Sequence, residues 1–252
     1  MNTPAIAVSN LSKRYDDVVA LDDASFEVPL GTICGFVGPN GSGKTTTIRM
    51  LLGLIKPSSG TGTIIGNSIS HPEKYLKDVG AMIEGPAFYP ALSGLENLKV
   101  FAKLGGIQFE RCQDLLELVG LGDRGRDKYK NYSLGMKQRL GIAAALLPNP
   151  KLLILDEPTS HLDIGHQIAL LNSLTELSKE SNCAVVASLH DIGLIGRGFT
   201  HALLFTSTGG DEGSYISGAV NDVVNPANLE KALGHPVQRV IAADGRQVFI
   251  PA

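Results

Sequence analysis

Short apolar runs alternate with longer segments of helical periodicity along most of this chain. The runs lie at 33–37, 79–83, 152–155 and 184–188, and their length and flanking residues predict buried strands. Apolar residues recur with helical spacing over 97–104, 111–119, 136–147 and 168–179. Strands that alternate with helices predict an α/β fold with a parallel sheet and helical crossovers.

The first part of the chain has a different pattern. Residues 5–8 are expected to form a first strand, followed by a polar turn at 11–17. Residues 18–21 and 24–28 are expected to form half-buried antiparallel strands. A further short strand is expected at 61–65. The pattern predicts one domain over 1–252, with a core over about 5–85 and 148–205, a helical part over about 86–147 and a C-terminal extension over about 206–252.

Composition narrows the class of protein. The apolar fraction is 43% and the net charge is −3, so no basic field for nucleic acid is expected. Cys34, Cys112 and Cys183 lack metal-binding spacing and are expected to be reduced cytosolic thiols. The N-terminal residues show no basic segment followed by an apolar one, so no secretion signal is expected. No apolar run reaches the roughly 18 residues that a membrane span requires.

A glycine-rich loop connects the strand at 33–37 to a helix that starts near Thr46. Its residues are Gly38, Pro39, Asn40, Gly41, Ser42, Gly43, Lys44, Thr45 and Thr46. Glycines let the backbone curl so that N–H groups point at phosphate oxygens, and the positive end of the helix lies behind them. Lys44 is placed to reach the β- and γ-phosphates, and Thr45 to ligate Mg²⁺. The alternative is an ordinary glycine-rich turn, which the flanking strand and helix disfavour.

Two acids follow the buried strand at 152–155. In a parallel sheet, the carboxyl ends of the strands form the edge where ligands bind. Asp156 is therefore expected to hold Mg²⁺, and Glu157 to act as general base on the attacking water. His190 follows the strand at 184–188 and is expected at the same edge, near the γ-phosphate. The alternatives are acids at a strand-to-turn boundary and a structural histidine.

A third candidate element is the segment 132–140, where Ser133 precedes a helix. Ser133 is either an ordinary N-cap or part of an anion site together with Gly135. Since one nucleotide cannot easily use two helix ends of one molecule, the second possibility requires a second copy in head-to-tail arrangement. Tyr15 is either a surface tyrosine or the platform on which adenine stacks.

Taken together, these motifs resemble the nucleotide-binding subunit of an ABC transporter. The resemblance covers the phosphate loop at 38–45, the signature motif at 132–138, the second Walker motif at 152–157, the D-loop at 160–163 and the single residues His190 and Tyr15. It implies a P-loop NTPase fold with a RecA-like parallel-sheet core, an antiparallel β subdomain and a helical subdomain. It also implies ATP and Mg²⁺ as ligands, ATP hydrolysis in which Lys44, Glu157 and His190 take part, and Asp163 as a link between two ATP sites.

Three positions depart from the family pattern. The signature core is Ser133-Leu134-Gly135-Met136, with Gln138 displaced, instead of the usual Ser-Gly-Gly-Gln. His161 replaces a glycine of the D-loop. Glu84 stands where the family has a glutamine that ligates Mg²⁺ and senses the membrane partner. Because a carboxylate is also a hard oxygen ligand, Glu84 is expected to bind Mg²⁺ and to preserve hydrolysis.

The same departures resemble bacterial subunits for bacitracin-type resistance and lantibiotic immunity, which implies export of a peptide or drug. The C-terminal segments 223–226, 229–236 and 245–251 instead resemble importer ATPases for siderophores or cobalamin. A soluble ABC ATPase without a transport role is a third possibility, disfavoured because the chain carries one complete site. The expected partners are a second copy or a homologous ATPase subunit, and integral membrane permease subunits at the cytoplasmic face of the plasma membrane, where this chain would bind peripherally.

Overall fold

The central element is a six-stranded sheet, seen in the computed structural model, which describes residues 3–83, 87–206, 215–241 and 247–252. Its strand order is β10-β9-β3-β8-β7-β6. The strands are β3 (Ile33–Val37), β6 (Val79–Met82), β7 (Leu152–Leu155), β8 (Ala184–Leu189), β9 (His201–Phe205) and β10 (Tyr215–Ala219). All pairings are parallel except that of β10 with β9. The predicted parallel sheet is confirmed, and every residue of β3, β7 and β8 is buried.

A second, antiparallel sheet covers one face of this core. Its order is β2 (Val18–Val28), β1 (Ile6–Tyr15), β4 (Ser59–Ile64) and β5 (Asn67–Ser68). The turn expected at 11–17 was wrong, because β1 continues to Tyr15 through register shifts that bury Leu11 completely. Bulges of this kind break the strict alternation by which a strand is recognised in a sequence.

Helices cover both faces of the central sheet. α1 (Lys44–Leu51) and the antiparallel sheet pack against one face of the central sheet. They form one hydrophobic core there together with Phe36 of β3. α5 (Ile164–Ser181) and α4 (Leu134–Leu146) pack against the other face, in the core that contains Val37. Neighbouring residues of β3 thus point to opposite layers, as strand geometry requires.

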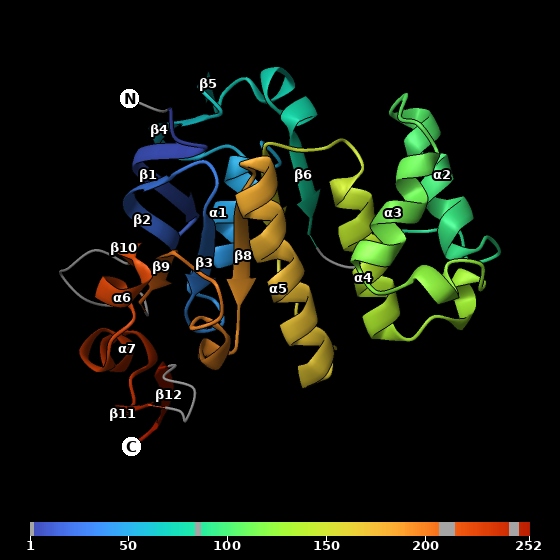
Figure 1. The fold of residues 1–252 in the computed structure, drawn as a ribbon. Coiled ribbons are helices and arrows are strands. Elements are labelled where there is room, and N and C mark those ends of the chain that lie inside the picture. The colour runs from blue at the N-terminus through green and yellow to red at the C-terminus, as the bar shows by residue number, and fades with distance from the viewer. Residues whose placement is uncertain (1–2, 84–86, 207–214, 242–246) are drawn as a thin grey trace.

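The insert between β6 and β7 contains α2 (Gly94–Leu104), α3 (Glu110–Leu118) and α4. Figure 1 shows these three helices together on one side of the molecule, away from the antiparallel sheet. Ser93 and Glu96 form a capping box at the start of α2, so this helix begins where its sequence provides partners for the free N–H groups. Short 3₁₀ turns complete the connections: η1 (Pro72–Lys74), η2 (Leu76–Asp78), η3 (Gly122–Arg124), η4 (Tyr129–Asn131) and η5 (Ile192–Leu194).

The chain ends in α6 (Val220–Val223), α7 (Pro226–Leu233) and the hairpin of β11 (Val237–Ile241) and β12 (Gln247–Pro251). Val223, Val224 and Leu229 are buried in the same core as Val37 and α5. Figure 1 places these elements at the opposite end of the molecule from α2 and α3. The extension is therefore a packed part of the fold.

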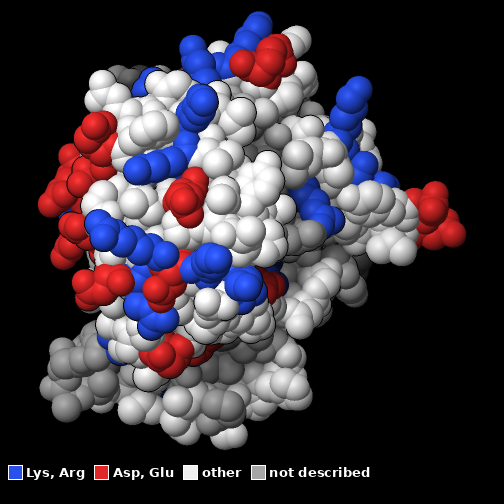
Figure 2. All heavy atoms as spheres, turned by 90° about the vertical axis from the view of Figure 1, so that its right-hand side faces the viewer, with Lys and Arg blue, Asp and Glu red and all other residues white. Residues whose placement is uncertain are grey.

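The cysteines, the helices and the surface charges of the structure bear on the expectations from composition. Cys34, Cys112 and Cys183 are free and buried, and burial raises the pKa of Cys34 and Cys183 to about 12. In the described part of the chain, no helix combines the length and the apolar character that a bilayer span needs. Figure 2 shows that Lys and Arg are interspersed with Asp and Glu on the face that carries the helical insert.

Candidate functional site

The phosphate loop lies between β3 and α1, and close contacts require glycine at two of its positions. Gly43 has φ 96°, and a Cβ there would lie 2.2 Å from the carbonyl oxygen of Ala20 in β2. A Cβ on Gly38 would lie 2.6 Å from the carbonyl oxygen of Phe205. Since atoms cannot approach this closely, any side chain would push the loop away from the two sheets that hold it.

The loop surrounds the side chain of Lys44. The Lys44 Nζ donates hydrogen bonds of 2.8 Å to the carbonyl oxygens of Gly38 and Pro39. Burial lowers the pKa of Lys44, against the opposing influence of the Glu157 and Asp156 carboxylates. The amine is thus held inside the loop by two carbonyl oxygens and is a cation of the kind that binds phosphate oxygens.

Ser42 supplies a second observation that fits a triphosphate. Its Oγ is buried and has no hydrogen-bond partner among the described residues. A buried hydroxyl without a partner is costly, and its occurrence calls for a ligand or water. The amine of Lys44 and this hydroxyl, at the start of α1, form a donor set that fits phosphate oxygens.

Asp156 joins the loop to the end of β7. Its Oδ2 accepts a hydrogen bond of 2.9 Å from Thr45 Oγ1, and its Oδ1 accepts one of 2.6 Å from Ser188 Oγ. A hydroxyl and a carboxylate at this distance are hard oxygen ligands of the kind that Mg²⁺ takes alongside phosphate and water. Thr45 and Asp156 are therefore candidates to hold Mg²⁺. Within the described residues there is no cluster of three or more His, Cys, Asp or Glu side chains that could hold a metal ion.

Sequence reasoning missed Ser188. Its hydroxyl is fully buried at the end of β8, where it donates to Asp156 and accepts from the backbone N–H of Glu157 at 2.8 Å. It thereby fixes both acids at once. The available signal was a polar residue within an otherwise apolar strand, next to the edge where the acids were expected.

Glu157 and His190 are in direct contact. His190 Nε2 lies 2.5 Å from Glu157 Oε1, and both side chains are about half exposed, at 45% and 41%. Glu157 has φ 51°, a left-handed conformation that is uncommon for a residue with a side chain. The predicted meeting of His190 with the acids at one sheet edge is present in this geometry.

The signature segment begins α4. Ser133 Oγ accepts a hydrogen bond of 3.2 Å from the N–H of Met136, as an N-cap does. Ser133 is exposed, and Leu134 is 55% exposed. A Cβ on Gly135 would lie 3.0 Å from the carbonyl oxygen of His161, so the helix start packs closely against the D-loop.

A cleft of about 380 Å³ lies between the start of α4 and the residues that follow β7. It is lined by Thr45, Leu134, Gln138, Asp156, Glu157, Ser160 and His161. Asp156, Glu157 and the start of α4 therefore face one open space, although the side chain of Ser133 is bonded within its own helix.

The remaining expected residues lie apart from this cluster or outside the described structure. Tyr15 is 43% exposed at the end of β1, with Lys13 Nζ 4.8 Å from its ring centre. Asp163 caps α5 by accepting from the N–H of His166 at 3.0 Å, which lowers the pKa of Asp163. Glu84 lies outside the described residues.

Comparison with known proteins gives two kinds of relative. The chain is 45% identical to the bacitracin transport ATP-binding protein BcrA of Bacillus licheniformis, over 73% of this chain and 61% of that protein. It is 39% identical to the lantibiotic transport ATP-binding protein SrtF of Streptococcus pyogenes, over 73% of this chain and 80% of that protein. The chain thus spans about three fifths of the length of the first curated relatives it matches.

A solved structure extends the similarity to the C-terminal elements. The inward-facing structure of a putative metal-chelate type ABC transporter matches 99% of this chain and 98% of its own, with a TM-score of 0.80 and 22% identity. At that identity the match shows a common fold. The family model for the ABC transporter matches residues 21–160, which include the phosphate loop, the signature segment and both acids. On this match and these relatives, the chain belongs to the ABC transporter family.

Proposed function

We propose that this chain binds and hydrolyses ATP to power a bacterial ABC transporter. The observation that carries the proposal is the convergence of Lys44, Thr45, Asp156, Glu157 and His190 at one edge of the sheet, with Thr45 bonded to Asp156 and His190 to Glu157. A cation in a phosphate loop, a pair of oxygen ligands for Mg²⁺ and a carboxylate oriented by histidine are the parts that hydrolysis of a terminal phosphate needs.

Each residue has a separate task in this proposal. Lys44 and the loop N–H groups hold the β- and γ-phosphates, and Tyr15 provides a face for adenine. Thr45 and Asp156 hold Mg²⁺, which when bound neutralises phosphate charge. Glu157 accepts a proton from the attacking water, and His190 keeps the Glu157 carboxylate in place beside the γ-phosphate.

The signature segment completes the site of a second molecule. The N-terminus of α4 is exposed, and Ser133 bonds only within its own helix among the described contacts. A helix start of this kind attracts anions. In a head-to-tail dimer with a second copy or a homologous subunit, Ser133 and Gly135 would contact the γ-phosphate that the other molecule holds.

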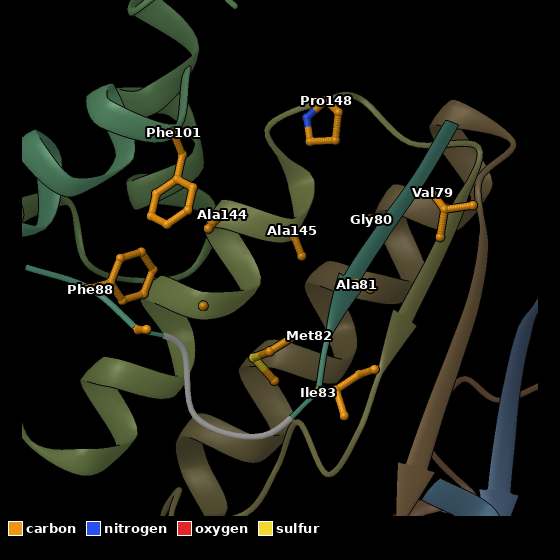
Figure 3. Close-up of a pocket in the computed structure, with 12 residues that line it drawn as sticks. Val79, Gly80, Ala81, Met82, Ile83, Phe88, Phe101, Ala144, Ala145 and Pro148 are labelled. Atoms are coloured by element: carbon orange, nitrogen blue, oxygen red, sulfur yellow. The ribbon is translucent and has the colours of Figure 1, made fainter. Parts of the chain in front are cut away.

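A groove beside the helical insert supplies a surface for a membrane subunit. It measures about 420 Å³ and lies between β6, α2 and α4 (Figure 3). The rings of Phe88 and Phe101 border one side, and Val79, Met82 and Ile83 border the other. An apolar groove of this size suits a short helix from a permease, which would hold this chain at the cytoplasmic face of the membrane.

Export of a peptide antibiotic or a similar drug is the favoured direction of transport. The names of BcrA and SrtF support it, because both relatives are named for transport of such compounds and are about 40% identical to this chain. If this chain shares their role, cells that lose it become more sensitive to bacitracin or to a lantibiotic.

Import is the second candidate, and the C-terminal extension favours it. The segments 223–226, 229–236 and 245–251 resemble importer ATPases for siderophores or cobalamin. In fold, the elements from α6 to β12 also fall within the match to the metal-chelate type transporter, which covers 99% of this chain at 22% identity.

The test has two steps that separate enzyme from transporter. Purified chain with Mg·ATP should release phosphate at a rate that Glu157→Gln abolishes. Extraction from its native membrane should then recover a polytopic subunit with it, and the substrate of that subunit decides between export and import. Absence of ATP hydrolysis in the recovered complex would contradict the proposal.

A further inference from the structure

The backbone carbonyl of Glu157 is the acceptor of three hydrogen bonds. Two come from Ser160, from its Oγ at 2.8 Å and its N–H at 3.1 Å. The third comes from Gln138 Nε2 at 2.9 Å. The two bonds from Ser160 lie within the turn after β7. Gln138 instead donates from α4, so its side chain links α4 to this turn.

Gln138 is placed where its amide has little freedom. It is 8% exposed, lies one turn after the signature residues and lines the cleft that contains Thr45, Asp156 and Glu157. A buried amide that donates to a carbonyl from a neighbouring element fixes the relative position of the two.

The backbone that Gln138 holds is a strained part of the site. Glu157 has φ 51°, and residues in this region persist only when their surroundings hold them. Ser188 holds the peptide unit before Glu157 by accepting from its N–H at 2.8 Å. Gln138 holds the unit after it. Together they set the direction in which the Glu157 side chain leaves the backbone and meets His190.

We infer that Gln138 is a positioning residue for Glu157, an inference that rests on the proposed ATPase function. Because Gln138 is part of α4, it also connects Glu157 to the helix start that faces the nucleotide of the second copy. Movement of α4 when Ser133 engages that nucleotide would therefore act on the general base of its own molecule. The alternative is a bond that merely fastens α4 to the sheet.

The test compares two glutamines that donate to the same turn. Gln138→Met keeps the length of the side chain and removes the amide donor. Gln138→Glu also removes the amide donor and keeps a polar side chain of the same length. The matched control is Gln167→Met, since Gln167 Nε2 donates from α5 to the carbonyls of Thr159 and Leu162 and not to that of Glu157.

Both Gln138 variants should lower kcat for ATP hydrolysis about tenfold, as expected when one hydrogen bond to the catalytic backbone is lost, while KM for ATP stays within about twofold. The Gln167→Met variant should change kcat by less than about threefold. Equal losses of kcat at Gln138 and Gln167 would overturn the inference, because they would indicate general loosening of the turn. So would an unchanged kcat in the Gln138 variants.

A measurement without turnover separates this inference from the proposed function. The imidazole NMR resonances of His190, assigned with His190→Gln, should shift in folded Gln138→Met or Gln138→Glu protein and stay unchanged in Gln167→Met. A chain that hydrolyses no ATP would contradict the proposed function, yet the shift would still show that Gln138 sets the Glu157–His190 contact. Unchanged His190 resonances in both Gln138 variants would overturn the inference.

Discussion

Two regions of the molecule carry nucleotide motifs, and they differ in how far a single chain completes them. The catalytic edge, defined as Lys44, Thr45, Asp156, Glu157 and His190, is held together by bonds among the phosphate loop, the start of α1, the residues that follow β7 and the end of β8. The signature tip, defined as Ser133, Leu134 and Gly135, is exposed at its first two residues, and its serine bonds only to its own helix among the described contacts.

The difference indicates which region depends on a partner. Side chains at the catalytic edge satisfy each other, so the edge has its geometry before any ligand arrives. The helix start at the signature tip leaves N–H groups that a single chain does not use fully. The catalytic edge can bind its ligand within a single chain. The signature tip acquires a role when a second molecule brings an anion to it.

The largest expected effect comes from removing Glu157, the proposed general base of the catalytic edge. Glu157→Gln keeps the shape and the contact with His190 but cannot accept a proton, so kcat should fall by roughly 10³-fold, within the range for a lost general base. ATP binding should be retained. Since ATP is held but not split, the variant should collect as a dimer with nucleotide, which gel filtration with Mg·ATP measures. A variant that stays monomeric with ATP would break the comparison, because the signature tip would then have no partner.

The second largest effect should come from Lys44→Ala. Loss of the buried amine removes a charge-assisted contact to phosphate, so the Kd for ATP should rise roughly 100-fold. Titration with a fluorescent ATP analogue measures it. Lys103→Ala is a suitable control, because Lys103 is an exposed lysine in the last turn of α2 and lies outside the phosphate loop. Unchanged affinity in Lys44→Ala would contradict the assignment of the loop.

Ser133→Ala tests the signature tip, and its control is Ser93→Ala. Both serines are N-caps whose hydroxyls accept from the third N–H of their helices, at 3.2 Å in each case. Each change should therefore destabilise the fold by about 1 kcal/mol. Only Ser133→Ala should also lower ATP hydrolysis, by roughly tenfold, because only its hydroxyl would reach the nucleotide of a second copy. Thermal unfolding and phosphate release, measured on both variants, separate the two contributions.

The two regions were also predictable to different degrees from the sequence. At the catalytic edge, Asp156, Glu157 and His190 directly follow apolar runs, and parallel strands bring their carboxyl ends together. The apolar runs and the geometry of a parallel sheet were enough to predict that these residues lie at one edge. Ser188 was missed because a hydroxyl inside a strand gives no periodic signal, and its role depends on which strand lies beside it.

At the signature tip, the sequence predicted the helix and its cap but not its tertiary contacts. Gln138 stood out only as displaced from a motif, since its bond to the Glu157 carbonyl depends on how α4 packs against β7. The extent of β1 was misjudged for a similar reason. Bulges interrupt its alternation, and the burial of Leu11 follows from the sheet around it.

The smallest expected effect lies at Glu84, in the segment between β6, which ends at Met82, and α2, which starts at Gly94. If Glu84 ligates Mg²⁺ as the family pattern implies, Glu84→Gln replaces one hard oxygen ligand with another and removes a negative charge. The value of kcat should then stay within about threefold of the original. Phosphate release measured over a range of Mg²⁺ concentrations checks this, with the isosteric change Glu73→Gln in the exposed turn η1 as control. Complete loss of hydrolysis in Glu84→Gln alone would make that carboxylate part of the catalytic edge. The comparison of the catalytic edge with the signature tip would then have to include the segment between β6 and α2.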